Sequence, residues 1–376
     1  MAVKSLNNLA LFLFLIFSAP LFSQIDSTKT KEEEEDYSIY ENVESEGKIK
    51  LYCNPKIFDL SPNRFISVGY DYIANSDLES SKQGAYLSDD KFSNPRKTSF
   101  VNYGLRLNAN IPVVSKAKIL WQIGGVYNKT NFEEKKIITQ PVLHDHDQDE
   151  LMRSLNQFGL TYSNINTTVF KPLSEKSFFI FQGMGELNGN FGFSKNSNSP
   201  NLNTIRTSAS ALYGKRPHDR FQWAVGLTRT YRAGELNYVP VVMYNYTSIN
   251  RKWGTEILFP ARASYRRKFN SRSILLAGYE LEGSSYRLYD TSFSPKNIEL
   301  RRSELRLRLD YQRQLKGFVW IAIQAGVRHN VNYNIDSLGD SNKDFFRGFV
   351  GTQKYVMLNN LSLVPYFNLS LNLVSP

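Results

Sequence analysis

The sequence has little cysteine and no long apolar runs after its first 25 residues or so. Its single cysteine, Cys53, cannot form an internal disulfide. One thiol is also too few for a cysteine-ligated zinc ion or an iron–sulfur cluster. A polytopic helical membrane protein needs several apolar runs of about 20 residues, and the sequence contains none. These absences exclude a disulfide scaffold, a cysteine-based metal centre and a membrane-embedded helical bundle.

Aromatic and basic residues are plentiful instead. The chain has 25 Phe, 22 Tyr and 4 Trp, which excludes a wholly disordered polypeptide. Its 46 Lys and Arg outnumber its 35 Asp and Glu and give a formal net charge of +11. A basic chain can bind nucleic acid. We expect no nucleic-acid partner here, because the arginines alternate with leucines along predicted strands and the chain carries an export signal.

Residues 1–23 have the pattern of a secretory signal peptide. Lys4 precedes the apolar run Leu9–Phe17, and the small residues Ser18 and Ala19 follow that run. This order of charge, apolar core and small residues is typical of a cleaved export signal. We place the cleavage after Ser23. The other interpretation is a buried N-terminal helix.

Residues 24–60 are predicted to form an acidic, flexible leader. Between Gln24 and Glu46, nine acidic residues face two lysines. A run of like charges repels itself and favours an extended, solvated tail. A plug or a partner-binding arm is the other interpretation of this segment.

From residue 61 onward, apolar and polar residues alternate with the period of two that is typical of β-strands. In Arg302–Gln312 the apolar residues Leu305, Leu307 and Leu309 share one face and charged residues share the other. About fourteen such segments follow one another. They include Trp253–Arg266 and Phe345–Tyr355, each taken as one strand. No segment after the signal peptide forms a convincing amphipathic helix.

Strand length indicates the kind of sheet. Strands of soluble proteins are most often about 5–6 residues long, whereas a membrane-spanning strand needs about 9–11 residues. Most of the predicted strands have ten residues or more. Backbone groups inside a bilayer must all be paired, so a membrane-spanning sheet closes on itself. The sequence therefore predicts an all-β protein, with a closed antiparallel transmembrane β-barrel of about 14 strands (12–16) over residues 61–376.

The connections between these strands alternate in places between long, polar segments and short turns, as they do in outer-membrane barrels. A strict alternation fails in the second half of the chain. Pro240 and Pro260 indicate a misplaced turn within Asn237–Lys268, because proline belongs at strand ends or bulges. Secreted β-sandwiches are the alternative fold.

The signal peptide, the segment Ser61–Ile73 and the block Tyr238–Phe269 resemble a family of bacterial outer-membrane β-barrel proteins of the domain-of-unknown-function type. The spacing of Pro240, Trp253 and Pro260 is the most specific part of this resemblance. It implies a barrel in the outer membrane of a Gram-negative bacterium, with outer-membrane lipid and the barrel-assembly machinery as partners. It implies no catalytic residues. Many such barrels end in an aromatic residue, whereas this chain ends in Ser375-Pro376.

Charged residues fall on the polar face of the predicted strands, and we expect this face to line the lumen. The expected lumen-facing residues are Arg106, Arg206, Arg262, Arg266, Arg302, Glu304, Arg306, Arg308 and Asp310. Rings of arginine in a pore favour anions. In the other interpretation, arginines and carboxylates pair across strands and fill the interior.

Sites for other chemistry are sparse. His144, His146 and Asp147 form the densest cluster of possible metal ligands, and such donors can hold a divalent ion. We expect a solvated acidic loop there, with no metal site and no cofactor. His218 and His329 lack serine and acidic residues at a spacing that suggests a catalytic triad. We therefore expect no enzyme, with an embedded hydrolase as the alternative.

These patterns together predict an outer-membrane β-barrel that passes small solutes through an arginine-rich, anion-leaning lumen. The alternative function is a structural or surface-binding barrel with a filled interior and no transport. The sequence indicates neither the substrate nor the oligomeric state.

Overall fold

The computed structural model describes residues 53, 55–82, 96–139, 146–192, 198–231, 237–289, 298–337 and 355–374. The predicted signal peptide, 1–23, and most of the predicted leader, 24–60, lie outside these residues. Among the described residues, no helix is long and apolar enough to cross a membrane.

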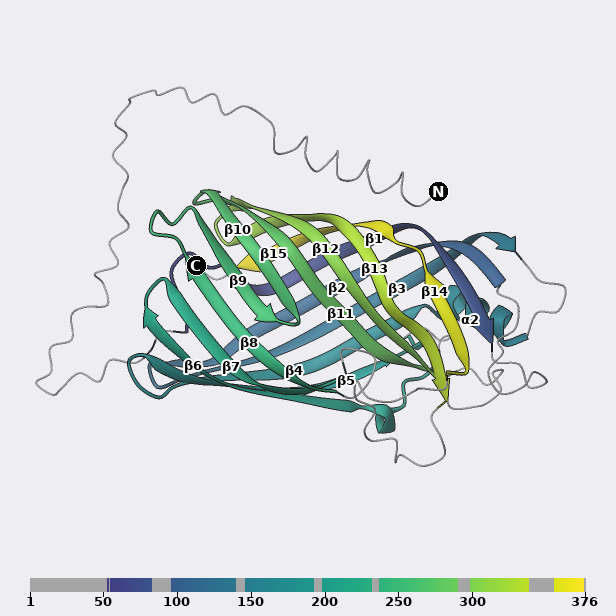
Figure 1. Ribbon diagram of the computed structural model, residues 1–376, viewed down its shortest axis with the longest axis horizontal. Coiled ribbons are helices and arrows are strands. Elements are labelled where there is room, and N and C mark those ends of the chain that lie inside the picture. The colour runs from purple at the N-terminus through teal and green to yellow at the C-terminus, as the bar shows by residue number, and fades with distance from the viewer. Residues whose placement is uncertain are drawn as a thin grey trace, which may run out of the picture. The chain divides into compact units, whose positions relative to one another are not determined.

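The alternating segments form one sheet of strands that run side by side at a common tilt (Figure 1). Their bounds are β1 (Arg64–Lys82), β2 (Arg96–Lys116), β3 (Ile119–Thr139), β4 (Leu160–Pro172), β5 (Ser177–Gly189), β6 (Arg206–His218), β7 (Phe221–Thr230), β8 (Asn237–Thr247), β9 (Trp253–Phe259), β10 (Arg262–Asn270), β11 (Ser273–Leu288), β12 (Ile298–Lys316), β13 (Val319–Ser337), β14 (Met357–Leu361) and β15 (Val364–Val374). A helix, α2 (His146–Phe158), and a single 3₁₀ turn, η2 (Leu202–Thr204), complete the described elements.

The sheet closes into a ring. Each strand from β1 to β13 pairs antiparallel with the next one along the chain, and β15 pairs with both β13 and β1. β14 also pairs with both β13 and β1, so β14 and β15 act as two halves of one interrupted strand. The result is a closed antiparallel barrel of fourteen strands, which confirms the predicted fold class.

Two of the predicted strand assignments differ from the structure. The segment taken as one strand from Trp253 to Arg266 is a hairpin of β9 and β10, and Pro260 lies at its turn. Proline has no backbone N–H to donate to the sheet, which suits this turn. The predicted strand Phe345–Tyr355 lies outside the described residues, except for Tyr355, which is not in a strand. The predicted count of about fourteen agrees with the ring, in which this hairpin supplies two strands where one was predicted.

Neighbouring strands run in opposite directions, and the two ends of the barrel differ in the length of their connections. Tight connections join β2 to β3, β4 to β5, β6 to β7, β8 to β9, β10 to β11 and β12 to β13 at one end, here called the turn end. The longer connections leave from the opposite end, here called the loop end. The β9–β10 turn is on the side of the loop end but lies closer to the turn end than the other connections there, because β9 and β10 are shorter than their neighbours.

The prediction that no helix follows the signal peptide was wrong. α2 begins at His146 and Asp147, which were expected in a solvated acidic loop. Its Leu151, Met152 and Leu155 lie on one face and are almost fully buried. The helix ends at Gly159, which has φ +62° and donates its N–H to the Leu155 carbonyl at 2.9 Å. Glycine at this position is a common helix terminator.

The outward face of the barrel wall is apolar. Tyr70, Leu307, Phe367 and Leu371 alternate with polar neighbours, and each keeps about half of its surface exposed. Trp320 is out of phase with this pattern and is 8% exposed, packed with Ile274, Leu276 and Val374. A strand with one apolar outward face suits a wall surrounded by hydrocarbon.

Candidate functional site

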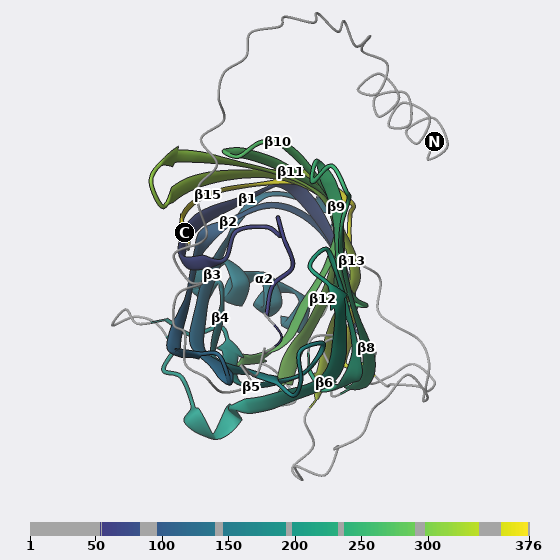
Figure 2. The same ribbon diagram turned by 90° about the vertical axis from the view of Figure 1, so that its left-hand side faces the viewer.

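The interior of the barrel near the loop end is filled by α2. Figure 2 shows the helix inside the ring of strands. Its three buried apolar side chains belong to one cluster with apolar residues of β1–β4 and β11–β14. The cluster comprises Leu78, Phe100, Phe132, Leu151, Met152, Leu155, Leu160, Tyr286, Leu288, Ile298, Leu300, Tyr333, Ile335, Met357 and Leu361. We call this cluster the apolar plug.

Lys129 of β3 fixes the end of the helix. Its Nζ donates to the Phe158 carbonyl at 2.5 Å, to the Phe191 carbonyl at 2.9 Å and to the Thr161 hydroxyl at 3.1 Å. The last carbonyls of a helix have no partner within the helix and carry partial negative charge. The lysine therefore satisfies the C-terminus of α2 and ties it to the wall.

A network of ion pairs lies deeper in the barrel, with Glu304 of β12 as one of its centres. The Glu304 side chain is fully buried. One of its oxygens accepts from Arg302 at 2.9 Å and the other accepts from Nε of Arg306 at 2.6 Å. The guanidinium of Arg328 on β13 lies 3.7 Å away. One carboxylate thus faces three arginines, and a buried charge needs such compensation.

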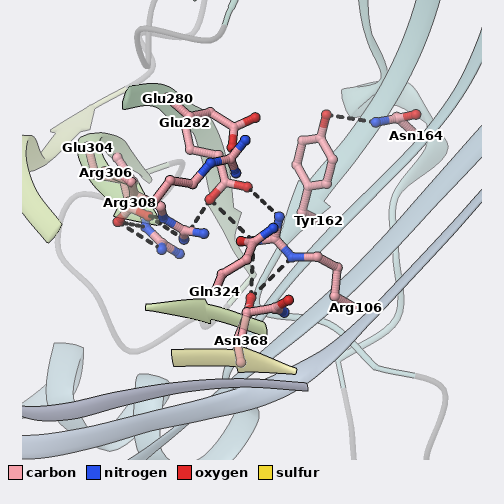
Figure 3. A network of polar contacts seen from close by, with 12 residues as sticks. Arg106, Tyr162, Asn164, Glu280, Glu282, Glu304, Arg306, Arg308, Gln324 and Asn368 are labelled. Atoms are coloured by element: carbon pink, nitrogen blue, oxygen red, sulfur yellow. Dashed lines mark hydrogen bonds and ion pairs between the residues drawn. The ribbon is translucent and has the colours of Figure 1, made fainter. Parts of the chain in front are cut away.

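The network crosses the interior from one wall to the other (Figure 3). Arg106 on β2 lies 2.9 Å from a Glu282 oxygen on β11 and 3.0 Å from an Asp71 oxygen on β1. Glu282 also accepts from Arg306 at 2.5 Å. Asp71 is held in turn by the Asn368 amide at 2.6 Å. β2 and β11 are not neighbours in the sheet, so the contact between Arg106 and Glu282 spans the lumen. We call this set the ion-pair network.

The predicted site residues do not all meet in this network. Arg106, Arg302, Glu304 and Arg306 lie in it. Close to it, Arg308 pairs with Glu280 and Asp310 pairs with Arg64 at 3.2 Å. Three others lie apart: Arg266 bonds Glu256 at 2.5 Å, Arg206 pairs with Glu299, and Arg262 is exposed. Their shared assignment to the lumen stays a prediction.

Sequence reasoning missed Asp71, Lys129 and Arg328. Asp71 continues the period-two pattern of Ser67 and Gly69 on the polar face of β1, so its position could have been predicted. The role of Lys129 could not have been predicted, because it depends on α2, which was not expected from the sequence.

A cavity of about 210 Å³ lies beside the ion-pair network. Among its lining residues are the cations Arg106, Lys129, Arg302 and Arg306 and the carboxylates of Asp71, Glu280, Glu282 and Glu304. Tyr162, Asn108, Asn128 and Asn164 add uncharged polar groups, and the Asn164 amide donates to the Tyr162 hydroxyl at 2.7 Å. Positive and negative groups balance in this lining, so it gives no advantage to anions.

The turn end is crossed by the segment before β1. The Cys53 N–H donates to the Ser174 carbonyl at 3.1 Å, and the Phe58 N–H donates to the Asp219 carbonyl at 2.8 Å. The Ser61 N–H reaches Glu256 at 2.8 Å. The segment therefore runs from the β4–β5 turn to β9.

Cys53 is buried, and burial raises the pKa of its thiol.

The side chains of the metal candidate lie outside the described residues. His144 lies outside the described residues, and the backbone of His146 and Asp147 begins α2, so part of the expected loop is helical. In the described ranges, no group of three or more His, Cys, Asp or Glu side chains could hold a metal ion. His218 ends β6 beside Phe221, and His329 is exposed on β13.

Several solved outer-membrane proteins are similar to this chain at very low identity. The toluene transporter TodX of Pseudomonas putida is 9% identical, with 86% of this chain and 95% of that chain covered and a TM-score of 0.30. A FadL homologue of Pseudomonas aeruginosa is 9% identical, with coverages of 83% and 90% and a TM-score of 0.30. The protease OmpT of Escherichia coli is 7% identical, with coverages of 83% and 96% and a TM-score of 0.25.

No curated protein matches the chain. The family profile described as "Domain of unknown function (DUF6268)" matches residues 66–373. The matched range begins in β1 and ends in β15, so it covers the complete ring. The chain belongs to this family of unknown function, DUF6268.

Proposed function

We propose that this protein is an outer-membrane β-barrel of a Gram-negative bacterium whose filled interior carries no steady flow of solutes. The membrane location is supported by the closed ring, by the apolar outward face and by the predicted export signal. A closed ring leaves no sheet edge unpaired, which is the condition for a sheet in hydrocarbon. The filled interior favours the structural or surface-binding barrel without transport over the open pore.

The observation that carries this proposal is obstruction at three levels. The apolar plug fills the loop end, the ion-pair network crosses the middle, and the segment 53–61 crosses the turn end. The network is the central obstacle, because Arg106 and Arg306 share Glu282, and Arg106 would lose this carboxylate if the two walls separated. Leaving buried charges without partners is costly.

One observation favours a second candidate, the passage of small polar solutes. The cavity beside the ion-pair network is lined by polar groups, and a purely structural barrel has no need of such a space. Its balanced charges fit neutral or zwitterionic solutes better than anions. In this candidate, solutes pass only when α2 leaves the loop end.

Conductance in a planar bilayer tests the proposal. We expect the wild-type barrel, folded as judged by its heat-dependent gel shift, to show no steady current steps. The double variant Leu151→Asp, Leu155→Asp places two carboxylates in the apolar plug. We expect it to conduct, because buried unpaired charges expel the helix. Leu202→Asp with Ile249→Asp makes the same change at exposed positions and should stay silent.

The outcomes separate the candidates. Steady steps from the wild type would overturn the closed barrel, and anion selectivity in those steps would restore the arginine-lined pore. If the plug variant does not fold, the wild-type recording still decides between them.

A further inference from the structure

The turn end of the barrel carries a basic residue at every tight turn. Lys118, Lys176, Arg220, Lys252, Arg272 and Lys316 lie in or beside successive turns around the whole circumference, and we call these six residues the basic collar. All are exposed except Arg220, which is partly exposed. Within the described part of the chain, none of the six has a carboxylate partner within ion-pair distance.

A second row of basic residues lies on the outside of the wall next to the collar. Lys171, Lys215, Arg267 and Arg313 are exposed near the turn-end termini of β4, β6, β10 and β12. Lys215 lies opposite Trp223 in the register of β6 and β7, and Arg267 lies opposite Trp253 in that of β10 and β9.

Tryptophan concentrates at the boundary between hydrocarbon and headgroups. The second row therefore lies at the height of that boundary, and the collar lies just beyond it.

The acidic residues of the tight turns do little to offset this charge. The tight turns contain Glu175 and Asp219, and Asp219 is already paired with Arg216 at 2.6 Å. The strands at the loop end are mixed by comparison, since β3 carries Glu133 and Glu134 beside Lys135 and Lys136. The excess of positive charge belongs to one end of the barrel.

We propose that the basic collar and the second row bind the phosphate headgroups of anionic phospholipids in the leaflet at the turn end. This inference rests on the membrane location proposed above. The occupant follows from the placement of the charges, which surround the barrel on all sides and include outward-facing wall residues. A protein or nucleic-acid partner docking onto the end would face only the turns. Clusters of lysine and arginine beside a hydrocarbon boundary attract anionic lipid.

The tryptophans offer a built-in reporter. Trp121, Trp223 and Trp253 lie near the starts of β3, β7 and β9, at the turn end, whereas Trp320 is buried. The protein is reconstituted into phosphatidylcholine vesicles that contain either brominated phosphatidylglycerol or brominated phosphatidylcholine at equal mole fraction. Bromine quenches tryptophan on contact. The ratio of the two quenching efficiencies measures the preference for the anionic headgroup.

We expect wild-type protein to prefer phosphatidylglycerol by about threefold at low salt, falling toward unity at high salt because exposed charges are screened. Lys118→Gln with Lys252→Gln, and separately Lys176→Gln with Lys316→Gln, should each lower the preference to roughly half. Lys135→Gln with Lys136→Gln removes the same charge from exposed positions toward the loop end and should leave it unchanged. The heat-dependent gel shift is measured for every sample.

Three outcomes would overturn the inference. The collar variants could keep the wild-type preference, or the Lys135 and Lys136 control could lose it equally. Inorganic phosphate could abolish the preference when chloride of the same ionic strength does not, which would indicate a site for free phosphate. A protein that shows no gel shift in vesicles would instead contradict the proposed membrane location, so the two failures are distinguishable.

Discussion

Glu304 shows how a single carboxylate holds the interior together. It is fully buried, and it compensates Arg302 and Arg306 directly, with Arg328 nearby. The sequence predicted that Glu304, Arg302 and Arg306 share the polar face, because period-two alternation fixes the face of each residue. It could not decide between an open ring of arginines and a paired interior. That choice depends on Asp71 and Glu282, which reach the network from distant parts of the chain.

Replacing Glu304 with glutamine should therefore destabilise the barrel strongly. Glu304→Gln leaves three guanidinium groups close together with one carboxylate fewer, and we expect a loss of about 3–5 kcal/mol in the free energy of unfolding. Glu280→Gln is the matched control. Glu280 and its partner Arg308 are less buried, so this change should cost about 1 kcal/mol. Urea unfolding in vesicles, followed by tryptophan fluorescence, measures both. Equal losses would contradict the special position of Glu304.

Among the elements, α2 was the largest omission of the sequence analysis. Its apolar face consists of three residues after a strongly polar start, too short a stripe to register as an amphipathic helix. The glycine that ends it was the available signal. The β9–β10 hairpin was missed because Trp253–Arg266 keeps its strand character across the turn, although Pro260 marked the position. Tertiary packing determines both α2 and the β9–β10 hairpin, and the local sequence indicates such packing only weakly.

The end of α2 gives a test at this scale. Gly159 has a positive φ, and a Cβ there would lie 2.4 Å from the Thr130 carbonyl oxygen. Gly159→Ala should cost about 2 kcal/mol or more, because left-handed backbone and a steric clash add together. Gly317 also has a positive φ but has open space around it, so Gly317→Ala should cost only about 1 kcal/mol. Unfolding in urea compares the two variants. A larger loss at Gly317 would argue against this account of the helix end.

For the whole molecule, the closed ring was the most predictable feature. Strand length and alternation required a sheet with one apolar outward face, and the need to pair every backbone group required closure. Which strands would meet could be inferred from sequence order for neighbours. The interruption between β14 and β15 could not be inferred from sequence order. Both halves pair with β1 and β13, and they differ only in which residues of those strands they meet.

A disulfide across the closing seam tests the ring directly. Tyr72 and Phe367 are opposite residues of β1 and β15. Opposite residues of antiparallel strands lie at a Cα separation of about 4.5–5.5 Å, within the range that a disulfide bridges. In a Cys53→Ser background, Tyr72→Cys with Phe367→Cys should crosslink on oxidation only after folding, seen as faster migration of the boiled, non-reduced protein. Tyr72→Cys with Tyr213→Cys, on strands that do not pair, should not crosslink. A folded barrel without the first crosslink would refute the closing pair.

The seam between β1 and β15 also sets the order of events when the protein is made. Asn368 lies 298 positions after Tyr70 and donates to its carbonyl, so β1 lacks this partner until nearly the whole chain has been synthesised. During that interval β1 presents an unpaired edge, and such an edge is a template for aggregation. Contacts this distant along the chain also form slowly. The nascent protein therefore depends on being kept apart from its own copies until β15 arrives, and a chain cut short before β15 leaves the parts of β1 and β13 that pair with β15 without a partner on that side.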